Sequence, residues 1–399
     1  MLNPKLIEYI FTAASIQRWN DYPRMVELVE LDKQAHKFII AYFIAKSEKV
    51  NMLHLIEAGL FEFFRRVVVT DIRPDVFHKA LEKKTDEINE WVLEKLHNAL
   101  LPIENGEFYK KFTNYLKDPT IYKKERYILK AASYISTRWE FSIVYQTSQF
   151  LSGIDLVKSA VEEELEDYYD LISVRKIALN KKLAKIVDLS GRLRFQKRWA
   201  QTPRIPETSV LGHMLVVAIL GYFYSINIKA CDSRKVYNFF CALFHDLPEA
   251  LTRDIISPVK YSVSGLDNII NEYEIKQIDD AIMPNIPNEL REEFSYLLGL
   301  DGDGKDEFTN RIFDKKPVIV DDLTNYNEDK YCAIDGLALK NCDRLAAFIE
   351  AVLSISYGVK SKELSSGTVY IKKNLKEKGS EGLVNFYDLA VEIEKYLMN

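Results

Sequence analysis

The chain of 399 residues is too long for one ordinary hydrophobic core, and its length favours two domains of about 150 to 200 residues each. It contains 47% hydrophobic and 28% charged residues, and its formal net charge of −5 gives no general attraction to nucleic acid polymers. Because no apolar segment reaches the roughly 20 residues of a bilayer span, and the N-terminus does not look like a secretory signal, we expect a cytoplasmic protein that binds no membrane.

Apolar residues repeat at intervals of three and four along most of the chain, and strand-like alternation is scarce, so we predict an all-α protein. In chain order, helical spacing is clear at residues 35–45, 154–187, 208–225 and 336–357. The charged stretch 154–187 has no Pro or Gly, and it is a suitable end of one domain and start of the next. We place the boundary near residue 165, which gives domains 1–165 and 166–399.

Short motifs recur in the same order in the two halves, which predicts an internal duplication. The matched pairs are Arg18-Trp19 with Arg198-Trp199, His36 with His213, Leu60-Phe61 with Leu243-Phe244, and Leu129-Lys130 with Leu339-Lys340. The differences fall on residues that chemistry would need: the first half has Glu62 in place of His245, Phe63 in place of Asp246, Arg66 in place of Glu249 and Ser133 in place of Asp343. The first half is therefore expected to keep the scaffold without the site. A chance alignment of similar helices is the alternative.

Four side chains that bind metals stand where apolar residues are expected. His213 lies in a segment that is apolar nearly all round, and His245-Asp246 follows an apolar run. Asp343 shares the apparent core face of the segment 336–357 with apolar residues. Buried imidazoles and carboxylates need partners, and one shared cation would satisfy all four groups.

The four side chains form a mixed nitrogen and oxygen set that suits one divalent ion of Mn, Co, Zn or Fe better than Ca²⁺. The sequence does not rank these metals. Two alternatives stay open at this point: His213 as a hydrogen-bonded core histidine, and Asp343 in an ion pair with Arg344 or Arg253.

The order of these residues resembles the HD superfamily, in which a distant His, an adjacent His-Asp pair and a final Asp lie on a bundle of helices. Arg198-Trp199 and the segment HDLPEALTRDIISPVK at residues 245–260 resemble the bacterial 5′-deoxynucleotidases of this superfamily. The resemblance implies two tandem HD-like helical bundles in one chain. The domain 1–165 is then the degenerate one, and 166–399 binds the metal.

The resemblance also implies a role for four further residues. Arg198 would bind the 5′-phosphate and Trp199 would shape the sugar pocket, while Glu249 and Asp254 would contact the reacting phosphate and its water. An arginine fork suits phosphate oxygens, and a glutamate near the metal can transfer protons. The alternatives are a solvated surface position for Glu249 and a structural role, such as a helix cap, for Asp254, which Asp71 matches in the first half.

We therefore predict an HD-type metal-dependent phosphohydrolase that releases phosphate from (deoxy)nucleoside 5′-monophosphates. Its partners are a small-molecule nucleotide and one divalent ion, and no nucleic acid polymer is expected. The alternative is a nucleotide-sensing regulatory protein with little or no turnover, which the retained Arg18-Trp19 favours. The sequence leaves open the base, the sugar, the native metal and whether the chain forms a homo-oligomer. For the first half we expect a scaffold role.

Overall fold

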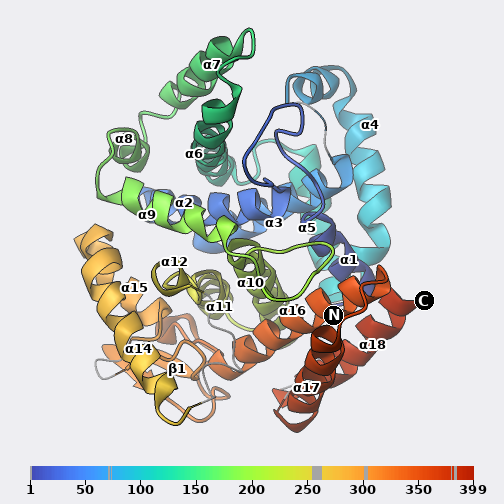
Figure 1. The fold of residues 1–399 in the computed structure, drawn as a ribbon, viewed down its shortest axis with the longest axis vertical. Coiled ribbons are helices and arrows are strands. Elements are labelled where there is room, and N and C mark those ends of the chain that lie inside the picture. The colour runs from blue at the N-terminus through green and yellow to red at the C-terminus, as the bar shows by residue number, and fades with distance from the viewer. Residues whose placement is uncertain are drawn as a thin grey trace. The chain divides into compact units, whose positions relative to one another are not determined.

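The computed structural model of the chain describes residues 2–70, 72, 74–253, 263–300, 304–378, 380–381 and 384–399. Within these residues the regular structure is almost entirely helical, which confirms the all-α prediction (Figure 1). The chain divides into two compact units, Met1–Leu171 and Ile172–Asn399. That each unit is an HD-like bundle stays a prediction.

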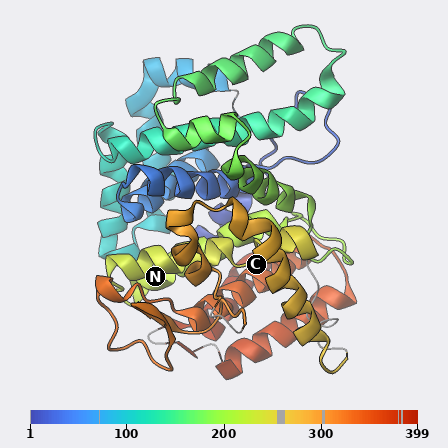
Figure 2. The same cartoon turned by 90° about the vertical axis from the view of Figure 1, so that its left-hand side faces the viewer.

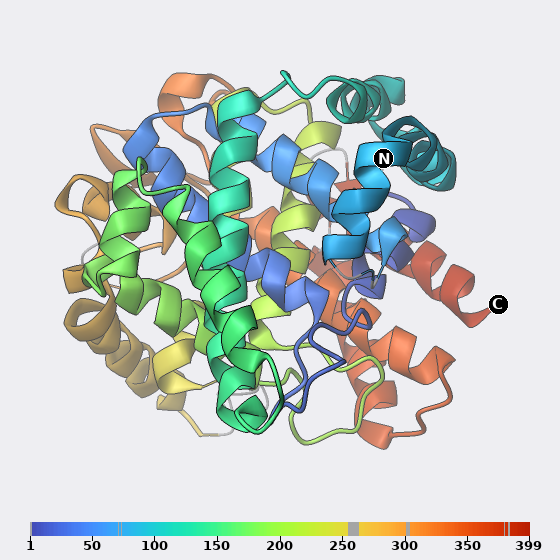
Figure 3. The same ribbon diagram turned by 90° about the horizontal axis from the view of Figure 1, so that it is seen from above.

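The Met1–Leu171 unit is built around one helix, α2, whose residues are buried from Glu30 to Ala45. It packs mainly on α6, the long teal helix of Figure 3. The helices of this unit are α1 (Pro4–Thr12), α2 (Glu30–Glu48), α3 (Met52–Val69), α4 (Pro74–Leu100), the 3-10 turn Ile103–Gly106, α5 (Glu107–Lys117), α6 (Lys123–Ser148) and α7 (Ile154–Glu166). Asn51 starts α3, because its side-chain oxygen accepts hydrogen bonds from two backbone N–H groups of the first turn.

The Ile172–Asn399 unit has a corresponding central helix, α10, which packs on α11 and α16. Its helices are α8 (Ile172–Ala178), α9 (Lys182–Arg192), α10 (Val210–Asn227), α11 (Asp232–Phe244), α12 (Glu249–Thr252), α14 (Leu266–Gln277), α15 (Arg291–Leu297), α16 (Gly336–Ser356), α17 (Lys362–Lys378) and α18 (Phe386–Met398). Short 3-10 turns lie at Leu193–Phe195, Met283–Asn285, Asn288–Leu290 and Asp329–Tyr331, and a π turn lies at Ile278–Ile282. Helices α17 and α18 pack on α16, in the orange-to-red part of Figures 1 and 2.

The strands are short and lie apart from the central helices. Strands β1 (Arg311–Asp314) and β2 (Lys316–Ile319) form one antiparallel pair, and β3 (Ser380–Glu381) and β4 (Val384–Asn385) form another.

Helix α10 is, within the described residues, the one helix long and apolar enough to cross a membrane, but 94% of its 18-residue window is buried in the fold. It is therefore a core helix. It comes very close to α16, since a Cβ atom on Gly221 would lie 2.7 Å from the Leu339 side chain. Asp335, just before α16, accepts hydrogen bonds of 2.7 Å from Arg234 and Asn238 of α11. These contacts fix the helices that carry the predicted site.

The charged stretch at 154–187 is not one continuous helix. It forms α7, α8 and the start of α9, with breaks after Glu166 and Ala178. Asn180 has a left-handed backbone (φ 52°), a conformation that asparagine tolerates better than most residues. The absence of Pro and Gly therefore did not guarantee helical continuity here.

Candidate metal centre

His213 lies in the first turn of α10, in a position set by the start of the helix. The Ser209 hydroxyl caps α10 by accepting a 2.9 Å hydrogen bond from the N–H of Gly212. The imidazole of His213 is fully buried, and two carboxylates from α16 flank it. Its Nε2 lies 2.9 Å from Oδ1 of Asp343, and its Nδ1 lies 3.2 Å from Oε1 of Glu350.

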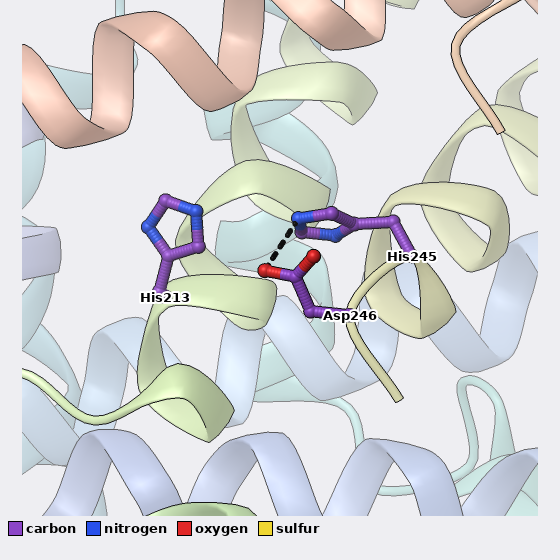
Figure 4. Close-up of side chains that lie close together, drawn as sticks. All are labelled: His213, His245 and Asp246. Carbon is purple, nitrogen blue, oxygen red and sulfur yellow. Dashed lines mark ion pairs between the residues drawn. The ribbon is translucent and has the colours of Figure 1, made fainter. Parts of the chain in front are cut away.

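His245 and Asp246 stand in a turn, because α11 ends at Phe244 and the next helix starts at Glu249. The Nδ1 of His245 lies 2.7 Å from the carbonyl oxygen of Ala242, and since this oxygen can only accept, Nδ1 carries the proton. In the neutral ring Nε2 then keeps a free electron pair. It is buried and makes no hydrogen bond, although Oδ2 of Asp246 is 3.1 Å away (Figure 4).

The structure brings the predicted ligands together from three helical segments. One nitrogen or oxygen atom of each of His213, His245 and Asp246 lies within 4.8 Å of the others, the only such group of metal-binding side chains among the described residues. Figure 4 shows the three side chains converging on one space. Asp343 is not part of this group, but its Oδ1 lies 2.9 Å from Nε2 of His213.

These donors fit a divalent cation. Burial lowers the pKa of His245, but Asp246, 3.1 Å from its Nε2, raises it by more, and a divalent ion would take the place of the proton on this nitrogen. The Nδ1 of His245 is held by a backbone carbonyl, which is the usual way in which proteins orient a metal-binding histidine. Together with the carboxylates of Asp246 and Asp343, the set keeps the mixed nitrogen and oxygen character that transition metals prefer.

Glu350 is a site residue that the sequence reasoning missed. It is buried on α16, two turns beyond Asp343, and its Oε1 faces Nδ1 of His213. The same oxygen accepts a 2.8 Å hydrogen bond from Thr208, and Oε2 accepts one of 3.2 Å from the indole N–H of Trp199. A carboxylate behind a histidine fixes the ring and raises its basicity. The seven-residue spacing on one helix face was the available signal.

The charged groups around His213 shift one another's pKa values. Burial raises the pKa of Glu350, but Arg204, His213 and Arg198 outweigh it and leave that pKa well below its usual range. Burial and Arg198 lower the pKa of His213, whereas Glu350 and Asp343 raise it, to a net value of about 9. His213 is therefore protonated at neutral pH without an ion, and a metal must displace this proton because a ligating imidazole is neutral.

The two residues expected to bind substrate lie beside this group. Arg198 is half-buried, and its positive charge lowers the pKa values of Asp246 and Asp343. Trp199 donates its indole N–H to Glu350, and its ring edge is packed so closely on α17 that a Cβ on Gly367 would lie 2.7 Å from it. The tryptophan thus also holds Glu350 in place.

Glu249 is only 7% exposed, so it is not the solvated surface residue that the sequence left open. Its backbone N–H donates a 3.0 Å hydrogen bond to the carbonyl of Asp246, which places it one turn after the His-Asp pair. Asp254 lies outside the described residues. The side chain of Arg344, the ion-pair partner considered for Asp343, donates to Asn341 instead (3.0 Å).

Two histidines and two aspartates carried by helical segments are the pattern for which the sequence resembles the HD superfamily. Residues 190–372 match the family described as HD domain. This match supports the resemblance to the HD superfamily that the motifs predicted.

The chain also resembles curated 5′-deoxynucleotidases. It is 23% identical over 210 residues to those of Enterobacter sp. (strain 638) and Citrobacter koseri, and 24% identical over 207 residues to that of Cronobacter sakazakii. Each match covers 50% of this chain and 87% of the relative. The HD match and these relatives support a metal-dependent phosphohydrolase.

Proposed function

We propose that the chain releases phosphate from nucleoside 5′-monophosphates, deoxynucleotides among them, at one divalent ion in the unit Ile172–Asn399. The observation that carries the proposal is the convergence of His213, His245 and Asp246, with a buried imidazole nitrogen that makes no hydrogen bond. The similarity to 5′-deoxynucleotidases supports the choice of substrate.

The metal would be held by His213, His245, Asp246 and Asp343. A divalent ion bound there lowers the pKa of water and polarises a phosphoryl oxygen. The carboxylates of Asp246 and Asp343 stay ionised over the physiological range, since burial raises their pKa values less than the histidines and Arg198 lower them. His245 presents Nε2 because Ala242 holds its other nitrogen.

Arg198 and Glu249 would act on the substrate. The guanidinium of Arg198 offers paired donors for phosphate oxygens and charge for the transition state. Glu249, one turn beyond Asp246, would accept the proton of the attacking water, and Asp254 would assist it as the family resemblance implies. Trp199 would line the sugar side of the pocket while it holds Glu350.

A phosphate-release assay tests this proposal. The purified chain, supplied with Mn²⁺ or Co²⁺, is expected to release phosphate from at least one nucleoside or deoxynucleoside 5′-monophosphate. His245→Ala should lower kcat/KM by at least about 100-fold, because removing an inner ligand removes the ion. The matched control is His97→Ala, which changes an exposed histidine of the other unit and should leave the rate unchanged. A folded, metal-loaded chain that hydrolyses none of these nucleotides would refute the proposal.

A regulatory role is the second candidate, and a cytoplasmic location suits both. The feature that favours it is Arg18-Trp19, retained in a unit where the described residues contain no metal-binding group. Thermal stabilisation by a nucleotide without any turnover would support sensing and count against the enzyme.

A further inference from the structure

The two units repeat the same backbone path into their central helices. Trp19 and Trp199 both have left-handed backbones, with φ of 56° and 57°. Each unit has an isolated β-bridge before its central helix, Gln17–Val29 in one and Lys197–Ser209 in the other. A backbone hydrogen bond lies beside each bridge, from Arg18 N to Leu28 O and from Arg198 N to Thr208 O. The central helices then begin at Glu30 and at Val210. Every one of these pairs is 180 positions apart, so the segments entering α2 and α10 have equal length.

This correspondence pairs His213 with Lys33. The N–H of each donates to the residue four positions earlier, Lys33 to Val29 and His213 to Ser209. The sequence comparison had paired His213 with His36 by assuming a small insertion or deletion, but the equal lengths of the two entry segments leave no room for one.

A second correspondence joins α6 to α16. The indole N–H of Trp19 donates to Oε2 of Glu140 at 3.2 Å, as that of Trp199 donates to Oε2 of Glu350 at 3.2 Å. Glu140 and Glu350 are 210 positions apart, and the same interval pairs the nearby helix positions Ser133 and Asp343.

At the paired positions, each central helix contacts its partner helix through a different pair of side chains. In the HD domain, Nε2 of His213 meets Oδ1 of Asp343 at 2.9 Å. In the Met1–Leu171 unit, the amino group of Lys33 donates to the hydroxyl of Ser133. The lysine side chain is therefore directed toward the position of the metal ligands.

The third ligand segment is also altered. The Leu60-Phe61 match places Glu62 opposite His245, but α3 continues through Glu62 as a helix, whereas α11 ends just before His245. Glu62 forms an ion pair of 3.0 Å with Lys37, one turn beyond Lys33 on α2. A second lysine thus joins the helices that metal ligands join in the other unit.

We propose that the Met1–Leu171 unit contains a second HD-type site that binds no metal, in which the Lys33 side chain takes the place of the ion and of His213. The other charged side chains of this site pair with one another. Arg18 forms ion pairs with Glu30 and Glu140 at 3.1 and 2.8 Å, and Arg66 forms one with Glu30 at 3.3 Å. The inference goes beyond the catalytic proposal, since it holds for any substrate.

A gain of metal binding tests it in the full chain. In a His245→Ala, Asp246→Ala background, whose HD domain can no longer hold an ion, we expect no bound Co²⁺ in equilibrium dialysis. Adding Lys33→His, Glu62→His and Ser133→Asp should restore one Co²⁺ per chain, with the visible absorption of the bound ion as a second readout. The matched control carries the last two changes but keeps Lys33, and should bind at least 10-fold more weakly.

Two results would overturn the inference. One is a second ion bound by the unaltered chain and retained in the His245→Ala, Asp246→Ala background. The other is equal Co²⁺ affinity with and without Lys33. If the threefold change prevents folding, Lys33→His with Ser133→Asp leaves α3 intact and should still bind Co²⁺ measurably. A folded chain of this kind that binds none counts against the proposal. None of these outcomes depends on phosphate release, so failure of the hydrolase proposal is separately visible.

Discussion

The carboxylate of Glu350 fixes the ring of His213 from behind, and it is itself fixed by Thr208 and Trp199. The amide of a glutamine keeps only one accepting oxygen for these partners, and because it is neutral it does not raise the basicity of the imidazole. We therefore expect Glu350→Gln to weaken metal binding about 10- to 100-fold. Titration with a competing chelator measures this affinity.

Glu363→Gln is the matched control, because Glu363 is an exposed glutamate of the neighbouring helix α17. It should leave the affinity for metal unchanged. If Glu350→Gln lowered thermal stability but kept the full metal affinity, Glu350 would be a structural residue and not a positioning residue for His213.

The buried Lys33 should make the stability of the Met1–Leu171 unit depend on pH. Burial lowers its pKa from 10.5 to about 7, although Glu30 raises it in part. Between these values the unfolded chain holds a proton that the folded chain lacks, so the free energy of unfolding rises with pH, by up to about 1.4 kcal/mol per unit. Lys33→Met removes this dependence.

Urea unfolding of both proteins from pH 6 to 10 measures the effect. The free energy of unfolding of the unaltered chain, minus that of Lys33→Met, should increase from pH 7 upward. Lys117→Met, at an exposed lysine of the same unit, should give a difference that stays flat. A flat difference for Lys33→Met as well would show that Lys33 titrates normally and is not buried as described.

At this scale the sequence could single out His213, His245, Asp246 and Asp343 as candidate ligands, because polar side chains at apolar positions are unusual. Glu350 could not be recognised in the same way. Glutamate is common on helices, and the partners that define its role are 137 to 151 positions away in the chain.

Because α11 ends at Phe244, the adjacent residues His245 and Asp246 can both face the same metal ion. Neighbouring residues of a continuous helix point about 100° apart. Since the helix stops at Phe244, His245 turns back to the carbonyl of Ala242 and Asp246 turns toward its imidazole. The apolar run before His245 predicted the helix, but the place where it ends depends on contacts that the sequence does not display.

The close approach of α10 and α16 sets the distance between His213 and Asp343. At Gly221, a methyl group would meet only the end of the Leu339 side chain, which can rotate away. Gly221→Ala should thus be nearly neutral, since strain is offset by a helix propensity gain of up to about 1 kcal/mol. Gly221→Leu should cost about 1 to 3 kcal/mol and also weaken metal binding.

Chemical denaturation and chelator competition measure both effects, and Gly221→Ala serves as the control for loss of the glycine itself. Unchanged metal affinity in a destabilised Gly221→Leu chain would show that the helix spacing does not control the ligand geometry.

For the molecule as a whole, the sequence predicted the helical class because the three-to-four periodicity is strong in both units. The boundary was expected near residue 165, and the structure divides the chain after Leu171. The composition of the stretch 154–187 is uniform, so the sequence does not show where its helices end. In the structure they break before Ile172 and at Asn180. Local turns of this kind depend on packing and not on composition.

The two units should respond differently to metal. An ion that binds only the folded state stabilises it by about 2.7 kcal/mol when the free ion is at 100 times its dissociation constant. Because the ligands come from α10, α16 and the turn after α11, the addition of Mn²⁺ to chelator-treated protein should slow amide hydrogen exchange in these elements. Exchange in α2, α3 and α6 should not change, since Lys33 already occupies the corresponding place. Slower exchange in α2 and α6 that persists in the His245→Ala, Asp246→Ala chain would reveal a second ion and contradict the assignment of one metal to each chain.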